Sequence, residues 1–226
     1  MIKPLKFFIA IAAIGSLALS GCEKDESETT GTESMSFKIA VDNSVPGLPM
    51  VSVPNITWTT AMLDMARFEC EMKREGVVQY TREGGPVNNL NLLDSGSPFI
   101  EITFPRLTKF DEVTAEIEIA PSATKDPLVL KAEVTSPNSG NKIPVELYFN
   151  DAATLKAHVS NINVGRNTYI GVIMFQVNKL LGAADLSKLA TATRTNGKII
   201  ISKTSNVSLY NDAKAALNGS YDIKIE

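Results

Sequence analysis

Hydrophobic and polar residues alternate with period two through the middle of the chain. In residues 112–119, valine, alanine and isoleucine occupy every second position between glutamate and threonine. The same alternation recurs at residues 37–41, 68–72, 100–104, 128–134, 143–149 and 155–159. This pattern is typical of half-buried antiparallel strands, which turn one face to a core and the other to water. It predicts a sheet-built domain.

Turn-forming residues separate these runs. They occur at residues 84–86 (Gly-Gly-Pro), 95–98 (Ser-Gly-Ser-Pro), 121–122 (Pro-Ser) and 136–141 (Ser-Pro-Asn-Ser-Gly-Asn). Glycine, proline, asparagine and serine in such clusters favour loops and hairpins. Short strands broken at this spacing indicate a β-sandwich.

The C-terminal third has a different pattern. Residues 169–177 are rich in apolar and β-branched side chains and predict a buried strand, and 178–184 predict a helical turn. Two helices are expected, at 185–192 with Asp185 as N-cap and at 206–217 with Asn206 as N-cap and Gly219 beyond its end. Strands are expected at 197–201 and 221–225. The predicted fold is mainly β, an antiparallel β-sandwich with short helices in the C-terminal third.

The first 21 residues have the features of a secretory signal peptide. Lys3 and Lys6 precede a 12-residue apolar stretch, which is too short to span a bilayer, since that needs about 20 residues. The run Leu19-Ser20-Gly21-Cys22 follows. It resembles the lipobox of bacterial lipoproteins, and the resemblance implies cleavage before Cys22, lipidation of its thiol and attachment to a membrane.

Residues 23–28 (Glu-Lys-Asp-Glu-Ser-Glu) form an acidic cluster directly after Cys22. The cluster resembles the export signal on surface lipoproteins of the Bacteroidota, which implies an outer-membrane protein exposed at the cell surface. The following residues are polar and show no apolar periodicity. We therefore expect residues 22–35 to be an acidic and polar tether, and residues 36–226 to be a single β-sandwich domain with C-terminal helical additions.

Three further segments carry a second resemblance. Residues 89–94 read NLNLLD, residues 100–105 read IEITFP, and residues 110–113 read FDEV. Together they resemble a group of uncharacterised bacterial lipoprotein domains with a transthyretin-like or carbohydrate-binding-like fold. The resemblance implies a β-sandwich and carries no catalytic signature.

Composition narrows the classes of partner. Two of the 22 basic residues precede Cys22, so the expected mature chain keeps 20 basic against 25 acidic residues, a net charge of −5. This balance argues against nucleic acid and anionic lipid as partners, because both need a basic face. Only Cys70 accompanies Cys22, so no internal disulfide is expected once Cys22 is acylated. Cys70 is expected to be a buried, inert thiol.

The sequence predicts no catalytic residues, no metal site and no cofactor. His158 is the only histidine and is expected on the exposed side of a strand, where it cannot form a catalytic triad or a zinc site. Glutamates two apart, at 69 and 71 and at 116 and 118, have a spacing compatible with glycosidase carboxylates but are common on any solvated strand. Oxygen-bearing side chains at 88, 89, 91 and 94 could attract calcium but lack EF-hand spacing.

Trp58 and Tyr80 are the candidate ligand-binding residues. Trp58 is the only tryptophan; it either packs in the core beside Ile56 or forms a platform for a sugar. The expected function is non-catalytic: a lipid-anchored protein that binds a glycan or a protein partner at the cell surface. The alternative is a structural role, as an adhesin or a component of envelope assembly.

Overall fold

The computed structural model describes residues 32–41, 56–94, 98–105, 110–135, 140–164, 169–176, 180, 186–218 and 220–226. These residues form fourteen strands, arranged in two sheets, and two helices. The prediction of a mainly β protein is therefore confirmed. None of the helices in the described ranges is long and apolar enough to cross a membrane.

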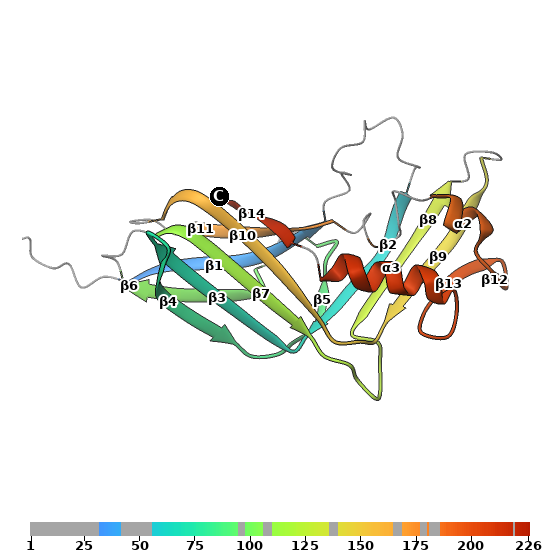
Figure 1. Cartoon of the computed structure of the whole chain (residues 1–226), viewed down its shortest axis with the longest axis horizontal. Helices are drawn as coiled ribbons and strands as arrows, with labels where there is room; N and C mark the ends of the chain where they lie inside the picture. Colours follow the sequence, from blue (N-terminus) through green and yellow to red (C-terminus); the bar gives the residue numbers. More distant parts are fainter. Residues whose placement is uncertain are drawn as a thin grey trace, which may run out of the picture.

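The larger sheet has eight strands in the order β4-β3-β7-β10-β14-β11-β1-β6. Their bounds are β1 Thr32–Val41, β3 Arg67–Arg74, β4 Val77–Gly84, β6 Ile100–Pro105, β7 Phe110–Ile119, β10 Ala153–Val164, β11 Tyr169–Phe175 and β14 Ser220–Ile225. The smaller sheet has six strands in the order β12-β13-β9-β8-β2-β5. Their bounds are β2 Ile56–Met65, β5 Val87–Asn91, β8 Leu128–Thr135, β9 Lys142–Phe149, β12 Arg194–Thr195 and β13 Lys198–Ile201. The two sheets lie beside each other along the long axis of the molecule (Figure 1).

The sheets are not purely antiparallel, so this part of the prediction needs correction. Strand β1 runs parallel to β11, β10 parallel to β14, and β13 parallel to β9. Parallel neighbours need a long crossover between them. The chain between β9 and β13 includes helix α2 (Leu186–Thr191), and the chain between β10 and β14 includes helix α3 (Val207–Leu217). Alternation along one strand records which face is buried, and it contains no information on the direction of the neighbouring strand.

The larger sheet closes on itself through side chains. The Tyr80 hydroxyl on edge strand β4 donates a 2.5 Å hydrogen bond to the carbonyl oxygen of Thr103 on the opposite edge strand, β6. Gly84 on β4 packs so closely that a Cβ there would lie 2.2 Å from the Cδ1 of Ile100. No backbone ladder joins the two edges in the described strands. The sheet is therefore barrel-like, and in Figure 1 β3 and β7 run obliquely across β1 and β11.

Aromatic side chains fill the inside of this sheet. Phe37 and Phe68 are completely buried with ring centroids 5.2 Å apart, and Phe104 packs edge-to-face on Phe110 at 5.5 Å. Aromatic rings bury the largest areas of any side chains, and such ring pairs add about 0.5–1.5 kcal/mol beyond the burial. The inner positions are those that the alternation predicts, because every second residue of a strand faces the same side.

Helix α3 covers the inner face of the smaller sheet. Leu209, Ala213 and Leu217 recur every four residues along it and are buried, and Tyr210 stacks on Phe149 of β9 at 5.5 Å. The helix follows β13 in the smaller sheet and leads to β14 in the larger sheet (Figure 1). Buried residues from both sheets form one hydrophobic cluster.

The start of the folded domain also needs correction. Strand β1 begins at Thr32, so residues 32–35 of the expected tether belong to the larger sheet. Their backbone pairs with β6, from Thr32 opposite Pro105 to Met35 opposite Ile102, and the Met35 side chain is completely buried. Met35 is the only apolar residue in this polar stretch, so the periodicity analysis found the strand from residue 37 onward and missed its start. Cys22 lies outside the described residues.

Four strands escaped prediction: the two-residue strand β12, and β2, β4 and β5, whose alternation is interrupted. In β2 a bulge between Trp58 and Thr60 shifts the inward positions by one residue. In β4 a bulge leaves Gln79 without a partner on β3, and much of the strand is exposed. Strand β5 has only five residues and includes Asn89 with a φ of 57°. A bulge adds one residue and so breaks the period of two.

Both predicted helices are present, with one difference at a cap. Asn206 occupies the N-cap position of α3 but has a φ of 48° and does not cap the helix with its side chain. Its amide nitrogen instead donates to the carbonyl oxygens of Thr193 at 3.0 Å and Ile200 at 2.8 Å. Asp185, Gly219 and, apart from Leu180, the expected helical turn at 178–184 lie outside the described residues.

Gly171 on β11 gives a test of the packing. A Cβ at this position would lie 2.7 Å from the Cε1 of Phe37, its cross-strand partner, whose ring is fully buried. We expect Gly171→Ala to lower the free energy of unfolding by about 1–3 kcal/mol through overpacking. Gly85→Ala is the control, because nothing lies within 4 Å of a Cβ there, and it should change stability by less than about 0.5 kcal/mol. Equal urea midpoints for the two variants would contradict this packing.

Candidate functional site

Two pockets compete as the functional site. The first, here called the Trp58 pocket, has a volume of about 480 Å³, and its lining residues are Ala40, Val41, Ile56, Thr57, Trp58, Leu92 and Leu93. The second, the α2–α3 pocket, has a volume of about 320 Å³, and its lining residues are Lys188, Thr191, Ala192, Asn206, Val207, Ser208 and Leu209. Both volumes fall in the range of about 300–1,000 Å³ that is usual for small-molecule sites.

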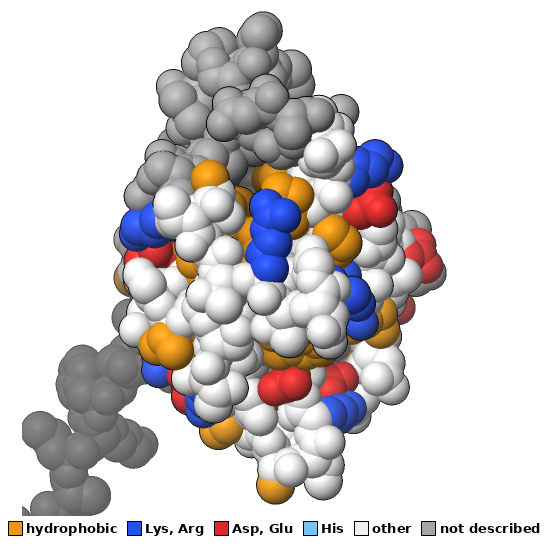
Figure 2. Space-filling view, turned by 90° about the vertical axis from the view of Figure 1, so that its right-hand side faces the viewer, with side chains coloured by type: hydrophobic (Ala, Val, Ile, Leu, Met, Phe, Trp, Pro, Cys, Tyr) orange, Lys and Arg blue, Asp and Glu red, His pale blue; other side chains and the backbone are white. Residues whose placement is uncertain are grey.

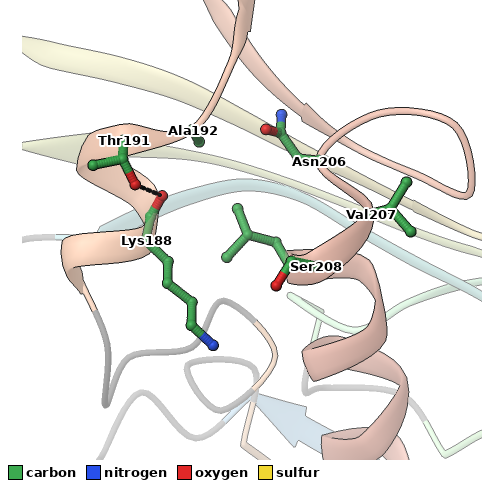
Figure 3. Close-up of a pocket in the computed structure, with 7 residues that line it drawn as sticks. Lys188, Thr191, Ala192, Asn206, Val207 and Ser208 are labelled. Atoms are coloured by element: carbon green, nitrogen blue, oxygen red, sulfur yellow. Dashed lines mark hydrogen bonds between the residues drawn. The ribbon is translucent and has the colours of Figure 1, made fainter.

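The polar groups of the α2–α3 pocket are largely used within the protein. The Lys188 ammonium lies 2.7 Å from an Asp212 carboxylate oxygen, and the Thr191 hydroxyl donates to the Lys188 carbonyl oxygen (Figure 3). The Asn206 amide is bound to backbone of the β12 and β13 region, and Val207 points away from α2. Figure 2 shows this end of the molecule, where apolar side chains form small separate areas among charged ones. These contacts favour a structural role, in which the pocket joins α2 to α3.

The Trp58 pocket lies where the two sheets meet. Ala40 and Val41 come from the end of β1 in the larger sheet, and Trp58 comes from the start of β2 in the smaller sheet. Trp58 is the cross-strand partner of Ala132, which is buried, so its ring shares the inner face of the smaller sheet. The ring is half-buried and packs against the hydrophobic core. Trp58 therefore both packs against the core and lines a pocket, so neither of the two roles that the sequence left open, a core residue or a platform for a sugar, is excluded.

The lining of this pocket is neutral. Among the described residues it contains six apolar side chains and the Thr57 side chain, and no charged residue. Leu93, at its rim, is 39 % exposed. An isolated charge moved from water into such surroundings loses hydration without gaining a partner. The pocket therefore suits an uncharged group.

Trp58 of the pocket and Gln176, which is not among the lining residues, each have a buried polar side-chain atom without a hydrogen-bond partner in the described part of the chain. The two atoms are the indole nitrogen Nε1 of Trp58 and the side-chain oxygen Oε1 of Gln176. Gln176 is 6 % exposed and directly follows Phe175, the cross-strand partner of pocket residue Val41. A buried polar group without a partner costs about 1–3 kcal/mol, and in native proteins it calls for an explanation such as a bound molecule.

Sequence reasoning did not single out Gln176, a buried polar residue that lies outside the lining of the Trp58 pocket. The signal was present, because Gln176 is a polar residue inside the apolar run 169–177 that predicted a buried strand. A buried glutamine must find partners for its amide, so a polar residue in such a run deserves separate consideration. The lining residues from β1 and from the segment after β5 could not be found in the same way, because only the folded chain brings them to Trp58.

Tyr80 does not join Trp58. It lies at the seam of the larger sheet, where its hydroxyl binds the Thr103 carbonyl oxygen and its ring contacts Phe104 at a centroid distance of 6.3 Å. Both its polar and its apolar parts are therefore engaged within the protein. This position favours a role in closing the sheet.

The paired glutamates lie on the outer face of the larger sheet. Glu69 on β3 is directly opposite Glu116 on β7. Arg67 contacts Glu69 and donates to Glu118 at 2.8 Å, while Lys156 lies 2.5 Å from Glu116. Neither of the two pockets includes a carboxylate in its lining. The arrangement is a ladder of ion pairs on a sheet surface, where each pair contributes about 0–1 kcal/mol.

The remaining candidates for chemistry lie as the sequence predicts. The His158 side chain is 51 % exposed, 3.6 Å from a Glu112 carboxylate oxygen. Cys70 is buried, and burial raises the pKa of its thiol to about 12, so the reactive thiolate is disfavoured. Asn91 uses its side-chain oxygen to accept from the backbone nitrogen of Leu93. Within the described ranges, no three His, Cys, Asp or Glu side chains are grouped closely enough to hold a metal ion.

Comparisons of the chain with protein-family models, with curated proteins and with solved structures find no match.

An ion-pair cluster around Asp151 anchors helix α3. Its two carboxylate oxygens lie 2.7 Å from the Lys203 ammonium and 3.0 Å from the Lys214 ammonium, and one accepts from the Tyr210 hydroxyl at 3.1 Å. The hydrogen bond from Lys203, assisted by those from Lys214 and Tyr210, lowers the Asp151 pKa to about 2. Burial, together with the Asp151 carboxylate, raises the Tyr210 pKa to about 12.

This cluster predicts a pH-dependent contribution to stability. A carboxylate with a lowered folded-state pKa stabilises the protein above its unfolded pKa of about 3.9, and the contribution is lost as pH falls from about 4 toward 2. Asp151→Asn should therefore be less stable than the wild type at pH 7, with a difference that shrinks over this range. Denaturant unfolding of both proteins at several pH values measures this difference in stability. Asp222→Asn, an exposed aspartate on β14, is the control and should change little; a constant Asp151→Asn deficit down to pH 2 would contradict the assignment.

Proposed function

We propose that this protein is a lipid-anchored, non-catalytic protein of the outer membrane that binds a glycan or a protein partner at the cell surface. The observation that carries the proposal is the Trp58 pocket, a neutral concavity with a half-buried indole whose N–H has no acceptor in the described residues. Large pockets with an apolar lining and a few polar groups are the usual form of a binding site.

The position of the pocket on β1 supports binding away from the membrane. The tether from Cys22 would enter β1 at Thr32, and Val41 of the pocket lies at the other end of this ten-residue strand. At about 3.3 Å per residue, the two ends are about 30 Å apart. The ten steps between Cys22 and Thr32 add up to about 35 Å when extended. A lipid on Cys22 would thus hold the larger sheet near the bilayer and leave the pocket accessible.

The sheet edges favour binding over assembly by strand exchange. Edge strand β4 has a bulge, and the exposed Arg82 puts a charge on the face that carries its cross-strand partner, the buried Cys70. Its seam with β6 is occupied by Tyr80. In the smaller sheet, edge strands β5 and β12 have five and two residues. Bulges, inward charges and short edge strands are the means by which proteins prevent the addition of another strand.

Lipid attachment at Cys22 is directly testable. We expect Cys22→Ser to abolish incorporation of labelled fatty acid and to release the protein from the membrane fraction, because the acyl chains provide the anchor. Cys70→Ser is the matched control, since Cys70 is the only other cysteine and is buried. It should keep the label. Mass spectrometry showing an unmodified Cys22 thiol in the purified wild type would overturn the anchor.

The binding role predicts a dependence on Trp58. Wild-type protein in detergent should bind at least one member of a glycan array or of an array of envelope proteins, without hydrolysing it. Trp58→Ala should lose this binding by tenfold or more, since an aromatic anchor in a pocket commonly contributes more than about 1.4 kcal/mol. Tyr148→Ala, which removes a half-buried aromatic from the other face of the smaller sheet, should retain it. Binding that is identical in both variants would place the site elsewhere.

A further inference from the structure

Two adjacent valines at the tip of the β3–β4 hairpin are exposed to solvent. Val77 is 60 % exposed and Val78 is 43 % exposed. The other exposed large hydrophobic side chains of the described residues, Leu93 and Val207, lie singly on separate segments. Successive strand residues point to opposite faces, so Val77 and Val78 give the hairpin tip apolar surface on both sides.

The turn holds this tip in a defined shape. Glu75 and Gly76 connect β3 to β4 with φ values of 52° and 75°. Positive φ at both central residues is typical of a type I′ turn, which matches the twist of the two flanking strands. The Glu75 backbone nitrogen also donates to an Asp111 carboxylate oxygen of β7 at 2.9 Å. The valines are therefore presented on an ordered turn, which lowers the entropic cost of any contact that they make.

The tip lies at the end of the larger sheet where the tether enters. Tyr80 of β4 binds the Thr103 carbonyl oxygen of β6. Gly84 packs on Ile100, which is earlier in β6, so β4 and β6 run in opposite directions. Val77, which precedes Tyr80, therefore lies toward the last residues of β6, and these pair with the first residues of β1. Figure 1 shows the β3–β4 turn and the start of β1 at the same end of the molecule.

The proposed anchor brings this end of the molecule to a bilayer. Ten steps along the chain join Cys22 to Thr32, the first residue of β1. A flexible chain of this length spans about 15–20 Å on average. A tip at the level of Thr32 is thus within reach of the membrane surface.

We infer that the tip of the β3–β4 hairpin rests on the lipid surface of the membrane that holds the anchor. The Val77 and Val78 side chains enter the boundary between headgroups and acyl chains, while the exposed Arg74 and Glu75 beside them stay among the headgroups. Two valines are too few to bind a membrane from solution, and the tether makes the contact effective by keeping the tip close. The contact orients the molecule, because Val41 of the Trp58 pocket lies at the far end of β1. This inference rests on the proposed anchor and adds an orientation to it.

A fluorescent probe beside the valines tests the contact. Arg74→Cys leaves both valines in place, and its thiol is the one that labels, because Cys70 is buried with its pKa raised to about 12 and Cys22 would carry the lipid. Full-length lipidated protein with an environment-sensitive dye at position 74 is reconstituted into phosphatidylcholine vesicles. We expect a blue shift of the dye emission and quenching by spin-labelled lipid of about twofold or more. Val207→Cys, labelled at the start of α3, is the control and should show neither change.

A valine variant tests whether the apolar side chains make the contact. Val77→Thr combined with Val78→Thr keeps the β-branched shape and the strand preference but adds two hydroxyl groups. With the dye at position 74, this variant should lose about half or more of the quenching. Its urea midpoint should be unchanged, because both side chains are exposed. Val207→Thr, a change of another exposed valine, is the control and should keep full quenching; equal quenching in the double variant and the wild type would overturn the contact.

Flotation of the vesicles separates this inference from the proposed anchor. Protein that does not float with the vesicles would overturn the anchor and the hairpin contact together. Protein that floats while the probe at position 74 keeps its emission in water would overturn the hairpin contact alone. Equal quenching at positions 74 and 207 would also overturn it, because the molecule would then have no preferred orientation. A blue shift in detergent that grows with protein concentration would identify a second copy of the chain as the occupant of the tip and overturn the lipid contact.

Discussion

Burial of the aromatic inner face of the larger sheet is the constraint on which the rest of the structure depends. Phe37, Phe68 and Phe104 are inaccessible to water in a sheet whose two edges meet at Tyr80 and Gly84. No backbone ladder joins β4 to β6 in the described strands, so the contact between these edges depends on how well their side chains fit together. Strand β1 is held between β11 and β6 by backbone pairing with both, and it carries two of the residues that line the Trp58 pocket.

The junction between the sheets follows from the way the chain crosses between them. Strand β2 of the smaller sheet ends at Met65 and β3 of the larger sheet begins at Arg67, so Ala66 alone makes the change of sheet. The Ala66 backbone nitrogen donates to the Glu118 carbonyl oxygen at 2.8 Å, which continues the pairing into the larger sheet. Helix α3 makes another crossing and is held by Asp151. The two sheets are thus tied by Ala66 and by helix α3, and the Trp58 pocket takes its lining from both of them.

The sequence predicted most of the strands but not the closure or the site. Residues 112–119 fold as predicted because the period of two follows from the strand itself. Strands β2, β4 and β5 were missed because bulges or a left-handed asparagine break that period. The parallel pairing was missed because it depends on which strand lies alongside. Trp58 was identified from its residue type. Val41 from β1 and Leu92 from the segment after β5 lie beside Trp58 only in the folded chain, which no local pattern records.

The contrast between the outer face and the pocket bears on which surface recognises a partner. On the outer face of the larger sheet, the charges of Arg67, Lys73 and Lys156 are met by glutamates of the neighbouring strands. A partner binding there would have to displace these pairs and solvent, with little net gain. At the Trp58 pocket, the indole N–H has lost its hydration in the folded protein without gaining a partner in the described residues. A new acceptor for this N–H would recover part of that cost, so of the two surfaces the pocket is the one where an added polar contact gains more free energy.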